Sequence, residues 1–130
     1  MNLSNNCDVH LTAGYATLSG VIISDNTIDI SNGCVFGGSG QTGSYIIVLD
    51  DKNDPTGQVM DVSNNTTAAI YYASAGRIHL NNNAAAKQLT AYGIDLDNNA
   101  TITYESGLAD VTFTSGPSGG YEVDHWKEVP

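Results

Sequence analysis

Three ionisable side chains, Asp61, His79 and Asp95, occupy the second position of a repeated seven-residue phrase. Imidazole and carboxylate groups are ordinary ligands for zinc and similar cations. The three residues follow one another at intervals of 18 and 16 residues, so a repeat fold would place them on adjacent strands with room for a cation between them. The simpler interpretation is a solvated polar face on which His79 separates two acids. We therefore keep this set as a candidate metal site.

A second acidic group, Asp50, Asp51 and Asp54, lies in a turn-rich loop. Carboxylates from one loop are typical calcium ligands. The spacing departs from that of an EF-hand, because Lys52 and Pro55 stand where oxygen ligands are needed. Aspartates near proline and glycine are also common in plain surface turns. Calcium is thus a candidate cofactor for these three residues, and a surface turn is the alternative.

The sequence contains no recognisable nucleophile motif and no phosphate-binding loop. Polysaccharide lyases built as parallel β-helices need clustered acids with a basic residue beside a groove, but Arg77 is the only arginine and no lysine shares a face with the acids. A hydrolase that uses Asp61 and Asp95 as its two carboxylates stays open. The 130 residues leave little chain for groove-forming loops. We expect a non-enzymatic protein.

The repeated phrase begins apolar, polar, apolar and continues into a polar turn. This alternation is typical of a short strand with one buried side. Its recurrence indicates stacked units that bury their apolar sides on one another. Successive starts differ by 19, 32, 18, 16 and 17 residues, and the step of 32 leaves room for a degenerate copy around residues 47–50. The six copies span residues 9–15, 28–34, 60–66, 78–84, 94–100 and 111–117.

The sixth position of every copy is glycine or asparagine, the residues that most readily adopt a left-handed backbone. We therefore expect one tight turn after each strand, with Asn65, Asn83 and Asn99 at positive φ and stacked asparagines forming amide ladders. The pattern predicts an all-β protein, a single right-handed parallel β-helix of about seven coils. A β-sandwich is the alternative, but it does not explain the recurring turn residue. The side chains expected to face the core are Ile28, Ile30, Val62, Ile78, Leu80, Ile94, Leu96 and Phe113.

Charge narrows the range of partners. The formal net charge is −10, and the chain has only four lysines and arginines. Four scattered cations do not form a surface that tracks phosphates, which excludes nucleic acid and anionic lipid as partners. No apolar run is long enough to span a bilayer and no secretion signal is present, so we expect no direct membrane insertion by this segment.

The two cysteines, Cys7 and Cys34, have two interpretations. A disulfide between them would tie the first coil to the second and would indicate an oxidising compartment. Two buried thiols are the alternative. Cys7 precedes the first phrase and Cys34 follows the turn of the second, so this phase does not require contact.

The last residues break the repeat. A Gly-rich turn leads into a strand that contains the only tryptophan, Trp126. A stack of strands must cover its open ends, because exposed edges template aggregation. We therefore expect β-helix repeats over residues 1–116 and a C-terminal capping strand over 117–130, with Trp126 folded on the last coil. An exposed Trp126 that binds sugar or protein is the alternative.

Residues 78–104 and 105–129, with their Asn-rich phrases and the closing Trp126, Lys127 and Glu128, resemble the C-terminal domains of bacterial type IV pilus-like accessory proteins. The resemblance covers most of the chain. It implies a cell-surface β-helix carried behind a prepilin-like apolar helix, which this sequence lacks. It implies no catalytic residues.

These observations predict an extracellular structural or adhesive module of a type IV pilus-like or cell-envelope system. Its expected partners are pilus or envelope proteins and surface glycans. One alternative is a self-polymerising scaffold similar to bactofilins, against which the expected cap argues. The other is a carbohydrate-binding or carbohydrate-active β-helix.

Overall fold

The computed structural model describes residues 1–67 and 69–103. In these residues the strands pair only in parallel, and one short 3-10 helix interrupts them. The protein is therefore all-β with a parallel sheet, as its repeat predicts. The elements are β1 (Asn2–Leu3), β2 (Asp8–His10), η1 (Ala13–Tyr15), β3 (Gly20–Ser24), β4 (Ile28–Ile30), β5 (Val35–Gly37), β6 (Ile46–Asp50), β7 (Gln58–Val62), β8 (Ala69–Leu80), β9 (Ala85–Leu96) and β10 (Thr101–Ile102).

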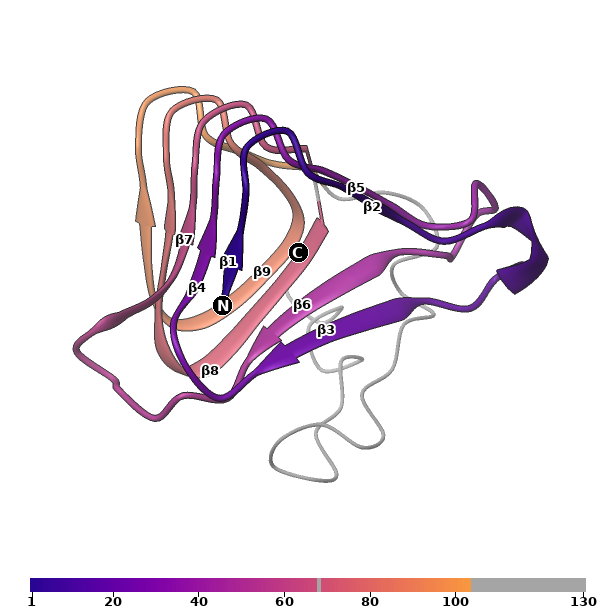
Figure 1. Ribbon diagram of the computed structural model, residues 1–130. Coiled ribbons are helices and arrows are strands. Elements are labelled where there is room, and N and C mark those ends of the chain that lie inside the picture. The colour runs from indigo at the N-terminus through magenta and orange to yellow at the C-terminus, as the bar shows by residue number, and fades with distance from the viewer. Residues whose placement is uncertain (68, 104–130) are drawn as a thin grey trace, which may run out of the picture.

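The described chain passes five times along one side of the molecule, which we call the first face (Figure 1). The five passes contain β1, β4, β7 and the last residues of β8 and of β9. Equivalent positions lie in register, and Ile78 pairs directly with Ile94, which confirms the predicted stacking of these two phrases. The column formed by the third position of each phrase is Leu3, Ile30, Val62, Leu80 and Leu96.

Two further faces complete each pass. The second face follows the turn and contains β2 paired with β5, and β10 paired with the start of β9. The third face contains β3, β6, the start of β8 and the middle of β9. In Figure 1 the pairs β2–β5 and β3–β6 extend to one side beyond the later passes, with η1 at the tip. The first two passes are thus wider than those that follow.

The main core lies between the three faces. The predicted inward residues Ile28, Ile30, Val62, Ile78 and Leu80 are all buried, with at most 1% of their surface exposed. The same alternation places Ile94 and Leu96 on the inward side of the last described pass, but they are 43% and 49% exposed. Phe113 lies outside the described residues.

The third face differs from the expected polar exterior. Val48 and Tyr71 belong to the main core, whereas their neighbours Ile47 and Ile70 form a second buried apolar cluster with Tyr45. Alternate residues of a strand point to opposite sides. Both sides of this face are therefore apolar and buried, a pattern found in parallel sheets.

The turns follow the predicted chemistry. Asn65, Asn83 and Asn99 have φ values of 59°, 61° and 63°, and Gly33 has 72°. The hydrogen bonds that join successive turns are made by the backbone rather than by the predicted side-chain amide ladder, as from Gly33 N–H to the Asn64 carbonyl at 3.0 Å. The expectation for Gly14 was wrong, because the first left-handed turn lies at Asn6, with φ 58°.

The phase of the first copy is therefore different from the prediction. The first pass runs through residues 1–7, since Asn2 pairs with Asp29, while Val9 pairs with Phe36 on the second face. Residues 47–50 are no degenerate copy, because they lie on the third face beside β3. The expected count of about seven coils is not confirmed. The copy at 111–117 and the cap at 117–130 lie outside the described residues.

Candidate functional site

A column of polar side chains runs along the outer side of the first face. Register pairs Asn2 with Asp29, Asp29 with Asp61, Asp61 with His79 and His79 with Asp95. These residues alternate with buried ones, which is why they point away from the core. We call this column the acidic column. The sequence predicted its last three members from the phrase alone.

His79 lies between two carboxylates. Its Nδ1 is 3.1 Å from Asp61 Oδ1, and its Nε2 is 3.1 Å from Asp97 Oδ2. Only the protonated imidazolium has an N–H on both nitrogens to donate to both acids. Asn81 supports this arrangement, because its side-chain amide donates to Asp61 Oδ1 at 2.7 Å. The group can hold a positive charge between two negative ones.

Asp95 has a different partner from the one that the metal prediction needs. The Arg77 guanidinium donates from Nε at 3.2 Å and from Nη2 at 2.8 Å to the two oxygens of Asp95. Such a two-pronged contact is among the stronger ion pairs. It lowers the pKa of the Asp95 carboxyl below its usual value and raises the pKa of the Arg77 guanidinium.

The predicted metal sets are not assembled in the described residues. No group of three His, Cys, Asp or Glu side chains is placed to hold a metal ion in residues 1–67 and 69–103. Asp61, His79 and Asp95 form the ion pairs given above instead. The sequence pattern missed Asp97, which lies two residues after Asp95 on the same side of the strand and turns toward His79.

The acidic loop is also built differently from a calcium loop. Asp50 is buried, with 1% of its surface exposed, and accepts a hydrogen bond from the Lys52 N–H at 2.9 Å. Burial raises the pKa of the Asp50 carboxyl, against the opposing effect of Lys52. The Asp54 carbonyl accepts from Gly57 N–H at 3.0 Å and closes the turn, while Asp51 is exposed. The three carboxylates therefore do not converge on one point.

Cys7 and Cys34 form a disulfide. Both residues directly follow the left-handed turn, at the seventh position of the first and second passes. Their Cα atoms are 4.5 Å apart because the passes stack in register. The shifted phase of the first copy is what brings the two cysteines together.

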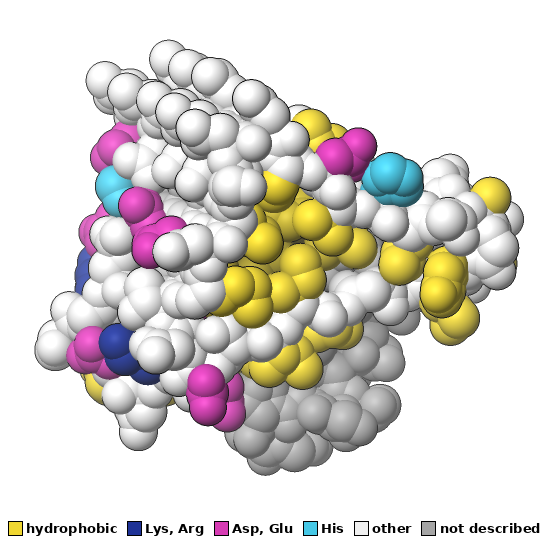
Figure 2. All heavy atoms as spheres, viewed as in Figure 1, with side chains coloured by type: hydrophobic (Ala, Val, Ile, Leu, Met, Phe, Trp, Pro, Cys, Tyr) yellow, Lys and Arg dark blue, Asp and Glu magenta, His cyan; other side chains and the backbone are white. Residues whose placement is uncertain are grey.

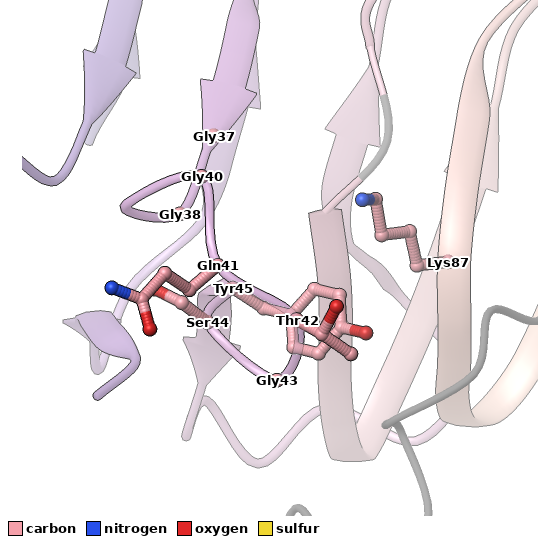
Figure 3. A pocket seen from close by; sticks show the side chains of 9 residues that line it. All are labelled: Gly37, Gly38, Gly40, Gln41, Thr42, Gly43, Ser44, Tyr45 and Lys87. Atoms are coloured by element: carbon pink, nitrogen blue, oxygen red, sulfur yellow. The ribbon is translucent and has the colours of Figure 1, made fainter. Parts of the chain in front are cut away.

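A hollow of about 340 Å³ lies beside the loop between β5 and β6. Figure 3 shows the loop on one side and Lys87, from β9, on the other. The Lys87 Nζ is 5.1 Å from the centre of the Tyr45 ring. The backbone folds closely here, because a side chain at Gly38 would overlap the Ser44 carbonyl. The hollow is lined by Gly37, Gly38, Gly40, Gln41, Thr42, Gly43, Ser44, Tyr45 and Lys87.

Sequence reasoning did not identify this hollow. The run of glycines between residues 37 and 43 was its only signal, because glycines cluster where the backbone turns sharply. Nothing in the phrase pattern connects that run with Lys87, which lies more than 40 residues later. The hollow is polar and offers hydroxyl, amide and ammonium groups to a small ligand.

The described part of the chain is thus an all-β protein whose parallel strands carry a column of acids and a polar hollow. Comparison with known proteins adds nothing further, because no protein family, no curated protein and no solved structure matches this chain. No helix in residues 1–67 and 69–103 has the length and apolar character needed to cross a membrane.

Proposed function

We propose that this protein is a right-handed parallel β-helix that acts as a non-catalytic structural or adhesive module at the cell surface. It belongs to a pilus-like or cell-envelope system and binds envelope proteins or surface glycans. The five in-register passes of the first face support the β-helix, because each pass adds one strand beside the previous one. Right-handed crossovers are the strong preference of parallel strands.

The acidic column carries the functional proposal. Asp29, Asp61 and His79 are held at one strand spacing along a rigid face. Parallel strands repeat at about 4.8 Å. A regular row of carboxylates suits hydrogen bonds to sugar hydroxyls or contacts bridged by divalent cations. The ion pairs of His79 and of Asp95 occupy the groups that a proton-transfer mechanism would need.

The disulfide supports an extracellular location. Cys7 and Cys34 are bonded to each other, and disulfides persist mainly in oxidising compartments. The net charge of −10 favours a soluble, repelling surface that binds selectively rather than to any polyanion.

The test is a panel of surface polysaccharides and envelope extracts, with and without calcium, incubated with the purified protein. We expect binding without turnover, weakened at least threefold by Asp29→Asn and by Asp61→Asn. Asp25→Asn is the matched control, because this exposed acid lies at the corner between β3 and β4, off the column. Release of reducing or unsaturated sugar ends, abolished by Asp61→Ala or Asp95→Ala, would contradict the proposal.

A second candidate, carbohydrate binding in the hollow, is favoured by its polar lining. Gln41 and Thr42 supply amide and hydroxyl groups, and Lys87 supplies a cation that suits an acidic sugar. A glycan array separates the two candidates. Binding lost in Thr42→Val and Gln41→Ala, but kept in Asp61→Asn, would assign recognition to the hollow rather than to the acidic column.

A further inference from the structure

Both ends of the described stack expose apolar side chains that belong to the inward side. At the N-terminal end, Leu3, Val9, Leu11 and Ile22 are only partly buried against the core. Figure 2 shows apolar side chains gathered at this end, in the area that β1, β2 and β3 enclose in Figure 1. Apolar side chains grouped at the end of a stack indicate a surface that another chain can cover.

The C-terminal end is exposed in the same way. Ile94, Leu96 and Ile102 are 43%, 49% and 46% exposed. Their register partners on the previous pass, Ile78, Leu80 and Ala86, are each 0% exposed. The last described pass therefore presents the same kind of inward side chain as the first, on the opposite end of the stack.

The backbone shows how one pass binds the next. On the first face, the N–H after the strand donates to the carbonyl of the strand before it, as from Ser31 to Leu3 and from Asp97 to Leu80, each at 2.9 Å. After the turn the rule repeats, from Val35 to the Cys7 carbonyl at 2.8 Å and from Thr101 to the Ala84 carbonyl at 3.0 Å. In the turn, the donor lies on the earlier pass, as from Asn6 to the Asn32 carbonyl at 2.8 Å and from Asn83 to the Asn98 carbonyl at 3.3 Å.

The two ends complete this pattern for each other. By the same rule, the Leu96 and Ala100 carbonyls lie on the outer edge of the last pass, and the Ser4 and Asp8 N–H groups lie on the outer edge of the first. In the turn, the Asn99 N–H faces outward at one end and the Asn5 carbonyl does so at the other. None of these six groups has a hydrogen-bond partner within residues 1–67 and 69–103. Unpaired strand edges of this kind template the addition of another strand.

We propose that the C-terminal end of one copy of this chain binds the N-terminal end of a second copy, in register, and so extends the stack. The turns match, because Asn6 and Asn99 have nearly equal φ values of 58° and 63°. The contact is made by the first face, the turn and the start of the second face. A head-to-tail contact does not close on itself, so it builds a filament rather than a dimer.

The side chains at the join fit this register. Leu3 of the second copy would lie on Leu96, Cys7 on Ala100 and Val9 on Ile102, which buries apolar side chains on both ends. On the outer side, the uncharged Asn2 would lie beside Asp95 and Ser4 beside Asp97. No like charges meet there, in contrast with the directly paired Asp29 and Asp61 inside the molecule.

The test uses two single-cysteine variants, Asn5→Cys and Asn98→Cys. Both asparagines are exposed and occupy the fifth position of the first and last passes, so they are adjacent only at the proposed join. The native Cys7–Cys34 bond shows that matched positions on adjacent passes are close enough to be linked. We expect a mixture of the two variants to form a mixed dimer on mild oxidation, identified by peptide mapping, while each variant alone stays monomeric.

Two outcomes would overturn the proposal. A homodimer of Asn5→Cys alone would show that the N-terminal ends meet each other, and a mixture without any mixed dimer would show that the ends do not meet. Sedimentation of the full chain provides a second measurement. Ile102→Lys is expected to weaken association at least tenfold, whereas Thr101→Lys, on the outer side of the same short strand, is expected to leave it unchanged. Equal association of the two variants would also overturn the proposal. Because none of these measurements involves a glycan, their outcome is independent of the proposed adhesive function.

Discussion

Cys7 and Cys34 occupy the same position of two successive passes, with their Cα atoms 4.5 Å apart, although 27 residues separate them in the chain. The bond therefore holds the first pass, which is the least covered, against the second. Its stabilising effect acts mainly by restricting the unfolded chain.

The first prediction concerns this bond. Replacing both cysteines by alanine is expected to lower the free energy of unfolding by about 2–4 kcal/mol, the usual effect of closing a loop of this size. Denaturant unfolding measures it. Hydrogen exchange should increase most in residues 1–11, because β1 and β2 each pair with one neighbouring strand only. Uniformly faster exchange throughout the described chain would contradict a local role.

The second prediction concerns the left-handed turn at Asn83, with φ 61°. Asn83→Val is expected to destabilise the protein by more than about 1 kcal/mol, because a β-branched side chain is strained at positive φ. Asn83→Gly is the matched control and should be nearly neutral, because glycine adopts this backbone freely. Thermal unfolding compares the two, and equal melting temperatures for wild type and Asn83→Val would count against the turn.

The third prediction concerns Asp50, whose pKa burial raises. A carboxyl with a raised folded pKa binds its proton more tightly in the folded state, so folding gains stability as the pH falls through that pKa. At pH 7 the buried charge opposes folding, although Lys52 and the Met1 amine lie near enough to reduce this effect. Asp50→Asn should therefore melt higher than wild type at pH 7, and the difference should narrow toward pH 4. A lower melting temperature for Asp50→Asn at pH 7 would show that these cations outweigh burial.

The fourth prediction concerns Arg77 and Asp95. The hydrogen bond from Arg77 lowers the pKa of Asp95. Stability from this pair is thus present above the pKa of an unfolded aspartate, about 3.9, and is lost as the pH falls through the lower folded value. Between pH 5 and pH 2.5, wild type should lose more of its melting temperature than Arg77→Gln. Arg77→Lys, which keeps the charge without the two-pronged contact, should fall between them. Identical acid profiles for all three would contradict the pair.

Several features were predictable because they depend on local chemistry. Asparagine tolerates a left-handed backbone, so Asn65, Asn83 and Asn99 located their turns without any knowledge of the fold. Apolar–polar alternation before each turn placed Ile78 on Ile94 and put His79 in one column with its acidic neighbours. The parallel all-β arrangement followed from the repetition of these signals.

The phase of the first pass depended on tertiary structure. Period-two alternation is the same on all three faces, so Val9 and Leu11 resemble first-face residues although β2 lies on the second face. Only the stacking of Asn6 on the later turns distinguishes them, and it also brings Cys7 to Cys34. The sequence by itself determined the turns and the alternation, because both are properties of a few consecutive residues. The tertiary structure decided which strands are neighbours, that Asp97 rather than Asp95 contacts His79, and that Lys87 lies beside the glycine loop, because such contacts depend on how far the chain travels between passes.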